Sequence, residues 1–75
     1  MDILAQITEQ DFNADGQLPQ GFLYASVKNV GAQTATVNGV SLPPGEAKDY
    51  PFVGKGYQAV PFVVNGSTLR ILHVV

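Results

Sequence analysis

The chain has 75 residues, a formal net charge of −2, no cysteine and one histidine. A chain of this length forms one domain, and the lack of cysteine excludes disulfides and thiolate metal sites. Only 13% of the residues are charged, against about 25% in ordinary soluble domains, so we expect other copies of the chain to cover part of its surface.

Charge and hydropathy also exclude two classes of partner. The four cations are scattered along the chain, whereas nucleic-acid binding relies on clustered Lys and Arg. No apolar run approaches the roughly 18 residues that a membrane span needs. The first residues lack the basic start and long apolar stretch of a signal peptide, which predicts synthesis in the cytoplasm. We therefore expect neither a nucleic-acid nor a membrane partner.

The first ten residues fit two secondary structures. Ile3, Leu4 and Ile7 share one face of a helix, while Ile3, Ala5 and Ile7 share one face of a strand. Residues 11–21 contain Asn, Asp, Gly and Pro and read as a loop. Four of the six acids lie before residue 21. We therefore predict an N-terminal arm with an acidic loop over 1–21, followed by a β domain over 22–75.

Beyond residue 21 the pattern predicts short strands and tight turns. Asn38-Gly39 and Asn65-Gly66 lie between β-forming residues and indicate two-residue hairpin turns, in which both residues need positive φ. Pro43 to Glu46 indicates another turn. Pro51 and Pro61 place their strands at an edge or bulge. The strands are expected over 22–29, 33–37, 40–42, 46–52, 57–64 and 67–75.

These elements predict the fold class. Six to seven short strands at this spacing are typical of a small antiparallel β-sandwich or barrel, here with an N-terminal arm or short helix. The last segment, 67–75, is apolar on both faces near its end, which predicts a central strand or one covered by a neighbouring chain. The expected edges carry Pro but few charges, and exposed edges pair with other chains.

One segment matches a metal-binding motif in part. Asp11, Asn13, Asp15 and Gly16 follow the opening of a calcium loop, in which oxygens at positions one, three and five converge. Position twelve, which should be a bidentate acid, is Phe22. The alternative is a loop whose Asn and Asp side chains cap local backbone amides. Both readings stay open at this point, with calcium as the cofactor in question.

Catalytic chemistry has no clear residue set in the sequence. His73 lies among apolar residues without a carboxylate nearby in sequence, which favours a packed or interfacial histidine over an acid or base. The serines do not lie in a nucleophile elbow. We therefore predict that the protein is not an enzyme.

An aromatic group flanks the Gly54-Lys55-Gly56 loop. Tyr50, Phe52 and Tyr57 lie close enough in sequence to cap one end of a barrel or to anchor a subunit contact. A platform for a sugar ring is the alternative. The sequence thus leaves a self-association surface and a carbohydrate- or surface-binding module as competing interpretations.

Four segments of the chain form a recognisable set: 27–31, 35–46, 50–52 and 67–71, with the turns Val37-Asn38-Gly39-Val40 and Leu42-Pro43-Pro44-Gly45-Glu46. Through these segments, the C-terminal two thirds of the chain resemble the small all-β virion proteins of tailed bacteriophages: capsid decoration, head-fibre and tail-spike base modules. The resemblance implies a symmetric, often trimeric, building block that docks on a capsid or tail through an N-terminal segment. It implies no catalytic residues.

The combined expectation is a non-enzymatic assembly module in a virion, made in the host cytoplasm. It would form a homo-oligomer, with a trimer favoured, and bind other virion proteins. Its strand faces and edges would carry the contacts. The residues expected at interfaces are Ile3, Leu4, Ile7, Tyr50, Phe52 and Tyr57.

Overall fold

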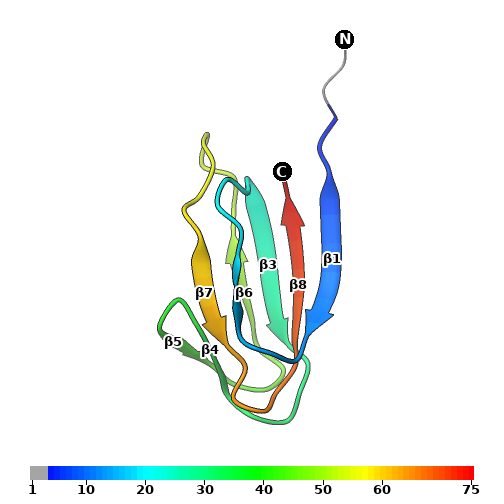
Figure 1. The fold of residues 1–75 in the computed structure, drawn as a ribbon, viewed down its shortest axis with the longest axis vertical. Coiled ribbons are helices and arrows are strands. Elements are labelled where there is room, and N and C mark those ends of the chain that lie inside the picture. Colours follow the sequence, from blue (N-terminus) through cyan, green and yellow to red (C-terminus); the bar gives the residue numbers. More distant parts are fainter. Residues whose placement is uncertain (1–3) are drawn as a thin grey trace.

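The computed structural model describes residues 4–75, and this range contains strands but no helix. The strands form two antiparallel sheets of four strands each, arranged like a small sandwich (Figure 1). The predicted all-β class is confirmed, but there are eight strands rather than six to seven. They are β1 Ile7–Phe12, β2 Gly16–Leu18, β3 Tyr24–Asn29, β4 Ala35–Val37, β5 Val40–Leu42, β6 Ala47–Tyr50, β7 Val60–Val63 and β8 Leu69–Val74.

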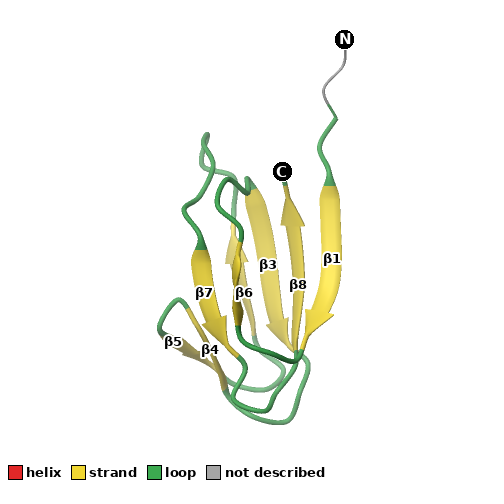
Figure 2. Cartoon of the chain, in the orientation of Figure 1, coloured by secondary structure: helices red, strands yellow, loops and turns green. Residues whose placement is uncertain are grey.

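The chain passes back and forth between the two sheets. The first sheet has the order β1-β8-β3-β6 and the second has the order β2-β7-β4-β5. Among consecutive strands, β4 and β5 alone are neighbours in one sheet, joined by a hairpin. The other connections are loops that join one sheet to the other at the two ends of the molecule (Figure 2). Both sheets therefore contribute to one shared core.

The core follows from the alternation of side chains along the strands. Ala25 and Val27 of β3 and Leu69 and Ile71 of β8 are at most 1% exposed, while their strand neighbours point away from the core. The central position predicted for β8 is confirmed, since β1 and β3 pair with it on either side. The buried apolar side chains are Leu18, Phe22, Ala25, Val27, Ala35, Val37, Leu42, Val60, Phe62, Val64, Leu69 and Ile71.

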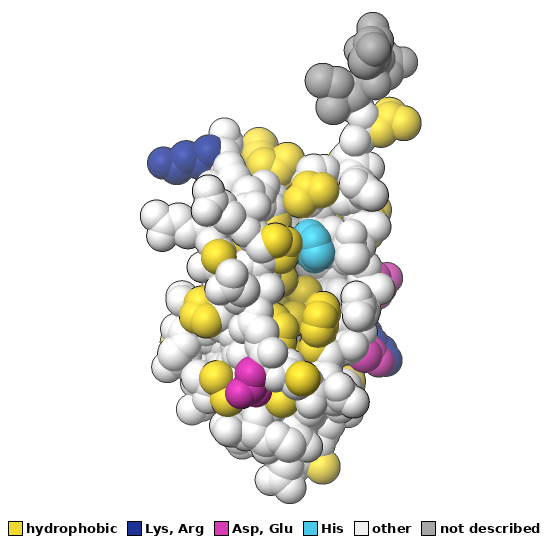
Figure 3. Space-filling model, in the orientation of Figure 1, with side chains coloured by type: hydrophobic (Ala, Val, Ile, Leu, Met, Phe, Trp, Pro, Cys, Tyr) yellow, Lys and Arg dark blue, Asp and Glu magenta, His cyan; other side chains and the backbone are white. Residues whose placement is uncertain are grey.

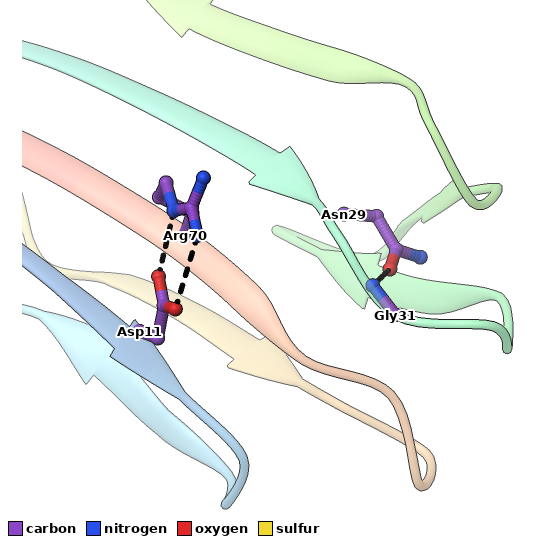
Figure 4. A network of polar contacts seen from close by, with 4 residues as sticks. All are labelled: Asp11, Asn29, Gly31 and Arg70. Carbon is purple, nitrogen blue, oxygen red and sulfur yellow. Dashed lines mark hydrogen bonds and ion pairs between the residues drawn. The ribbon is translucent and has the colours of Figure 1, made fainter.

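A buried asparagine joins the two sheets through polar contacts. Asn29 is fully buried at the end of β3, and its Nδ2 donates to the carbonyl oxygens of Gln33 (2.7 Å) and Leu42 (2.8 Å). Its Oδ1 accepts from the backbone N–H of Gly31 (3.1 Å, Figure 4) and from Ser67 Oγ (2.6 Å). Both donors and both acceptor positions of the amide are thus satisfied, which buried polar groups require.

The predicted tight turns are confirmed by the backbone, but the hairpin predicted at Asn65-Gly66 is wrong, because β7 and β8 lie in different sheets. Asn38 (φ 53°) and Gly39 (φ 76°) join β4 to β5, and Asn65 (φ 51°) and Gly66 (φ 80°) precede β8. Positive φ at both central residues defines the type I′ turn that Asn-Gly favours. The turn from Pro43 to Glu46 is also present. These turns depend on local backbone preferences, which the sequence shows directly.

The N-terminal segment is strand where the sequence left helix and strand open. Within residues 7–21, β1 belongs to the first sheet and β2 to the second. Hydrogen bonds to β8 hold β1 extended, and a three-residue apolar pattern cannot anticipate such distant partners. The loop predicted over residues 11–21 is wrong in part, because β1 continues to Phe12 and β2 occupies Gly16–Leu18. These two strands raise the count to eight.

Of the two positions expected for the Pro61 strand, an edge or a bulge, the edge is wrong. β7 lies between β2 and β4. Pro61 is tolerated there because β4 ends at Val37, and the next residue, Asn38, donates its N–H to the Pro61 carbonyl oxygen at 2.8 Å. The neighbouring strand β4 turns away at that point, so the missing N–H of Pro61 interrupts no hydrogen bond of the ladder.

Candidate interaction edge

β1 is an edge strand of the first sheet, with β8 as its neighbour in the described chain (Figure 1). Gln6 and Val75 exchange two backbone hydrogen bonds of 3.0 Å, which fixes the phase of the β1–β8 ladder. In an antiparallel ladder, pairs that exchange bonds alternate with pairs that do not. The N–H and C=O groups of Ile7, Glu9 and Asp11 therefore lie in the plane of the sheet and point away from β8, toward the open edge.

The β1 edge is longer than the other edges of the two sheets. It has six residues, whereas β6 has four and β2 and β5 have three each. Pro51 follows β6 directly and limits extension of that edge. A long free edge without proline is a template for an added strand. β1 is therefore the edge best suited to pair with another chain.

Both faces of β1 are open along most of the strand. Phe12, at its end, packs edge to face on Phe62 with ring centroids 5.4 Å apart. The other five residues of β1 are exposed on either face, and Ile7 retains 65% of its accessible surface. A six-residue strand so poorly covered by its own chain leaves room for a neighbour on both faces.

An apolar row on the outer face of the first sheet runs to this edge. Leu69 and Ile71 face the core, so Val74 of the same strand faces away from it. Val74 lies opposite Ile7 on one side and opposite Tyr24 on the other. Val74 and Tyr24 are half-buried, while Ile7 is exposed at the edge. This apolar row, made of Tyr24, Val74 and Ile7, thus ends at the open edge of the sheet.

An ion pair neutralises one of the two acids of β1. Arg70 Nε lies 2.9 Å from Asp11 Oδ1, and Nη2 lies 3.3 Å from Oδ2 (Figure 4). The hydrogen bond from Arg70 lowers the pKa of Asp11, and the same contact raises the pKa of Arg70. About half of each side chain is exposed, so the stabilisation is small. Glu9 makes no ion pair within residues 4–75.

The residues predicted to lie at interfaces separate into two groups. Leu4, Ile7 and Phe52 are exposed, at 83%, 65% and 63%. The loop that carries Phe52 lies at the end of the molecule toward which residues 4–6 also extend (Figure 1). Tyr50 and Tyr57 are half-buried. Ile3 lies outside the described residues.

The two tyrosines pack against Phe22 instead of forming an open platform. The Tyr57 ring stacks on Phe22 at 4.8 Å and 7°, and the Tyr50 ring meets both edge to face. Tyr57 donates its hydroxyl to the Pro51 carbonyl oxygen at 2.6 Å. Among these aromatic rings, Phe52 alone is exposed. The glycan alternative would therefore depend on Phe52 rather than on all three predicted residues.

The half-matched calcium motif forms a corner between the sheets. Asp11 binds Arg70, while Asp15 Oδ1 accepts the backbone N–H of Val64 at 2.9 Å. Asn13 is exposed. Gly16 serves close packing rather than a positive φ, since a Cβ there would lie 3.1 Å from the Phe62 ring. Calcium binding would compete with both of these hydrogen bonds.

The other side chains that could take part in catalysis or bind a metal lie apart from one another. His73 is half-buried opposite Thr8 of β1, and the buried Ser67 hydroxyl binds Asn29. Residues 4–75 contain no cluster of three His, Asp or Glu that could hold a metal ion, and these described residues form no pocket. In the same range, no helix has the length and apolar character needed to cross a membrane. Figure 3 shows one face, on which apolar side chains gather along the middle and charged groups are few.

Sequence reasoning found the side chains of this edge but missed its backbone. Leu4 and Ile7 were predicted as anchors, but the outward-pointing amides at Ile7, Glu9 and Asp11 were not. The signal available was the run Ile7–Phe12, which has β-formers and lacks Gly and Pro. Nothing local in that run shows on which side a strand will find its partner.

Comparison with known proteins gave no match: no family model, no curated protein and no solved structure matches this chain.

Proposed function

We propose that this protein is a non-enzymatic assembly module that self-associates through the free edge of β1. The observation that carries the proposal is the six-residue edge itself. Its outward N–H and C=O groups are unpaired in residues 4–75, and five of its side chains are exposed. Pairing with a second strand would satisfy this backbone and cover Ile7.

A second copy of the chain is the partner that the surface chemistry favours. The β1 edge carries the apolar Ile7, the acid Asp11 paired with Arg70, and the acid Glu9 without an ion pair. β1 has no cationic residue that could select a charged ligand. The low charged fraction of 13% also suits a surface that other copies cover. Symmetric association satisfies an exposed edge without a dedicated partner protein.

The wider role we propose is that of a virion component, such as a capsid-decoration, fibre or spike-like protein. The turn motifs shared with small all-β virion proteins support this part of the proposal. It implies synthesis in a host cytoplasm and contacts with other virion proteins. Particles purified from cells that carry the source genome should contain the protein, as seen by mass spectrometry. Its absence from particles despite abundant soluble protein would contradict the virion role.

The edge is tested by removing one outward amide. Glu9→Pro deletes an N–H that points away from β8, so the β1–β8 ladder is retained. Glu9→Ala is the matched control, since it removes the same side chain and keeps the amide. We expect light scattering to show oligomers for the wild type and Glu9→Ala and monomers for Glu9→Pro. A circular-dichroism melt checks that Glu9→Pro still folds. A folded Glu9→Pro variant with the wild-type mass would contradict the proposal.

A further inference from the structure

We infer that two copies pair antiparallel along β1 about a two-fold axis at Ile7, so that their first sheets become one continuous sheet. The inference rests on the proposed self-association and specifies its register. The axis position follows from three features of the edge: the phase of its backbone, the position of its one unpaired acid and the direction of the apolar row.

The phase of the backbone restricts the registers. The bonds between Gln6 and Val75 show that the backbone groups of the even-numbered residues of β1 bond to β8. Only the backbone groups of the odd-numbered residues can therefore bond to a new strand. This excludes an axis that lies between two residues. Among the axes that remain, those at Ile7, Thr8 and Glu9 lie closest to the exposed Ile7 and the unpaired Glu9. Each choice sets which residue of the second copy faces Glu9.

Charge and side-chain size distinguish the three registers. An axis at Glu9 places two carboxylates directly opposite each other, which is destabilising. An axis at Thr8 places Ile7 opposite Glu9 of the second copy, an apolar residue against a charge. An axis at Ile7 places Ile7 opposite Ile7 and the small Ala5 opposite Glu9. The last register alone separates the acids while pairing apolar with apolar.

The apolar row gives independent support for the axis at Ile7. Tyr24, Val74 and Ile7 are in register on the outer face. With the axis at Ile7, the row continues without a break into Ile7, Val74 and Tyr24 of the second copy. It would cover the Ile7 side chain, which is 65% exposed in the single chain.

The backbone and Leu4 fit the same register. Ile7 with Ile7, and Ala5 with Glu9 in both directions, would exchange about six hydrogen bonds. Leu4, 83% exposed, would lie beside Gln10 of the second copy on the inner face. The register thus accounts for two of the most exposed apolar side chains near β1.

Cysteine scanning tests the register, because the chain has no cysteine of its own. Ile7→Cys, Thr8→Cys and Glu9→Cys each place a thiol at one candidate axis. Opposed residues in an antiparallel pair lie about 4.5–5.5 Å apart between Cα atoms, within the range that a disulfide bridges. At low protein concentration in a glutathione buffer, we expect Ile7→Cys to form disulfide dimers at least tenfold faster than the other two variants. Non-reducing electrophoresis measures this.

The outcomes separate the inference from the function on which it rests. Faster cross-linking of Thr8→Cys or Glu9→Cys would overturn the axis at Ile7 and leave β1 pairing intact. A trimeric wild-type mass would overturn the two-fold pairing, since a two-fold contact closes at two copies, and would favour the trimer implied by the virion resemblance. A wild-type oligomer with no cross-linking at any position would overturn the β1 contact itself. A monomeric wild type at all concentrations would overturn self-association altogether.

Discussion

Ser67 donates a 2.6 Å hydrogen bond to the Oδ1 atom of Asn29, linking the end of β3 to the segment that leads into β8. Both side chains are buried, at 3% and 0% exposed. The same Asn29 binds the carbonyl oxygen of Leu42 in the second sheet. A chain of this size without disulfides needs another way to fix its sheets, and this asparagine provides part of it.

Replacing Asn29 by Ala should destabilise the fold strongly. The change leaves Ser67 Oγ, Gly31 N–H and two carbonyl oxygens without their partner in a buried site. Because an unsatisfied buried group costs roughly 1–3 kcal/mol, we expect a loss of at least about 3 kcal/mol in urea unfolding. Asn13→Ala, at an exposed position, is the control. A loss below about 1 kcal/mol at Asn29 would show that the network contributes little.

Gly31 should not accept a side chain. A Cβ at this position would lie 2.5 Å from the Thr68 backbone nitrogen and would also collide with Ser67 Oγ. Because backbone cannot move aside cheaply, Gly31→Ala should cost about 2 kcal/mol in the same assay. Ser67→Gly removes the Ser67–Asn29 hydrogen bond by itself, so it is the reference for the double variant. Adding Gly31→Ala to Ser67→Gly should destabilise the protein further, since the Thr68 clash persists. Wild-type stability of the single variant would contradict the close approach.

Acid should weaken the fold in part through Asp11. Arg70 lowers the pKa of Asp11 in the folded state, so the pair contributes stability above the unfolded pKa of about 3.9. That contribution is lost as the pH falls through the lowered folded pKa. We expect Asp11→Asn to show a smaller loss of stability over this acid range than the wild type. Equal pH dependence of the two proteins in thermal melts would argue against the ion pair in solution.

Tyr50→Phe should be tolerated or stabilising. The Tyr50 hydroxyl is buried and has no hydrogen-bond partner among residues 4–75, so its removal should raise the stability by about 1 kcal/mol. Burial and the nearby Tyr57 raise the pKa of Tyr50. Because the unfolded chain ionises Tyr50 first, the folded state loses stability as the pH rises from the unfolded pKa of about 10 toward the raised pKa of the folded state.

The alkaline limb provides a second measurement on the same variant. Tyr50→Phe should lose less stability than the wild type as the pH increases above about 10. Tyr24→Phe, in a half-buried tyrosine outside the cluster, serves as the control. A destabilised Tyr50→Phe at neutral pH would mean that the hydroxyl has a partner in solution.

Calcium should leave the melting temperature of the wild type unchanged. Asp11 and Asp15 already bind Arg70 and the Val64 amide, so a calcium ion would have to displace both contacts. Thermal melts in millimolar calcium and in chelator measure the effect directly, since a ligand of the folded state raises its stability. A clear rise with calcium, absent in Asp15→Asn, would establish the ion site that the sequence motif suggests.

The sequence by itself determined the features that depend on neighbouring residues. Asn38-Gly39 and Asn65-Gly66 form tight turns because these residues adopt positive φ at low cost. The alternation in β8 identified Leu69 and Ile71 as one face of a strand, since side-chain direction has a period of two. The all-β class follows from the same local patterns.

Tertiary structure alone decided which strand lies at an edge and which polar group lies in the core. Ile7–Phe12 became an edge strand, and Pro61 entered an interior one, through pairing with residues far away in the chain. Asn29 ends the strand predicted over 22–29, yet Leu42 and Ser67, distant in sequence, make it a buried link between the sheets. Local backbone preference cannot encode these outcomes, because the hydrogen-bond partners that satisfy each group are supplied only when the chain has folded.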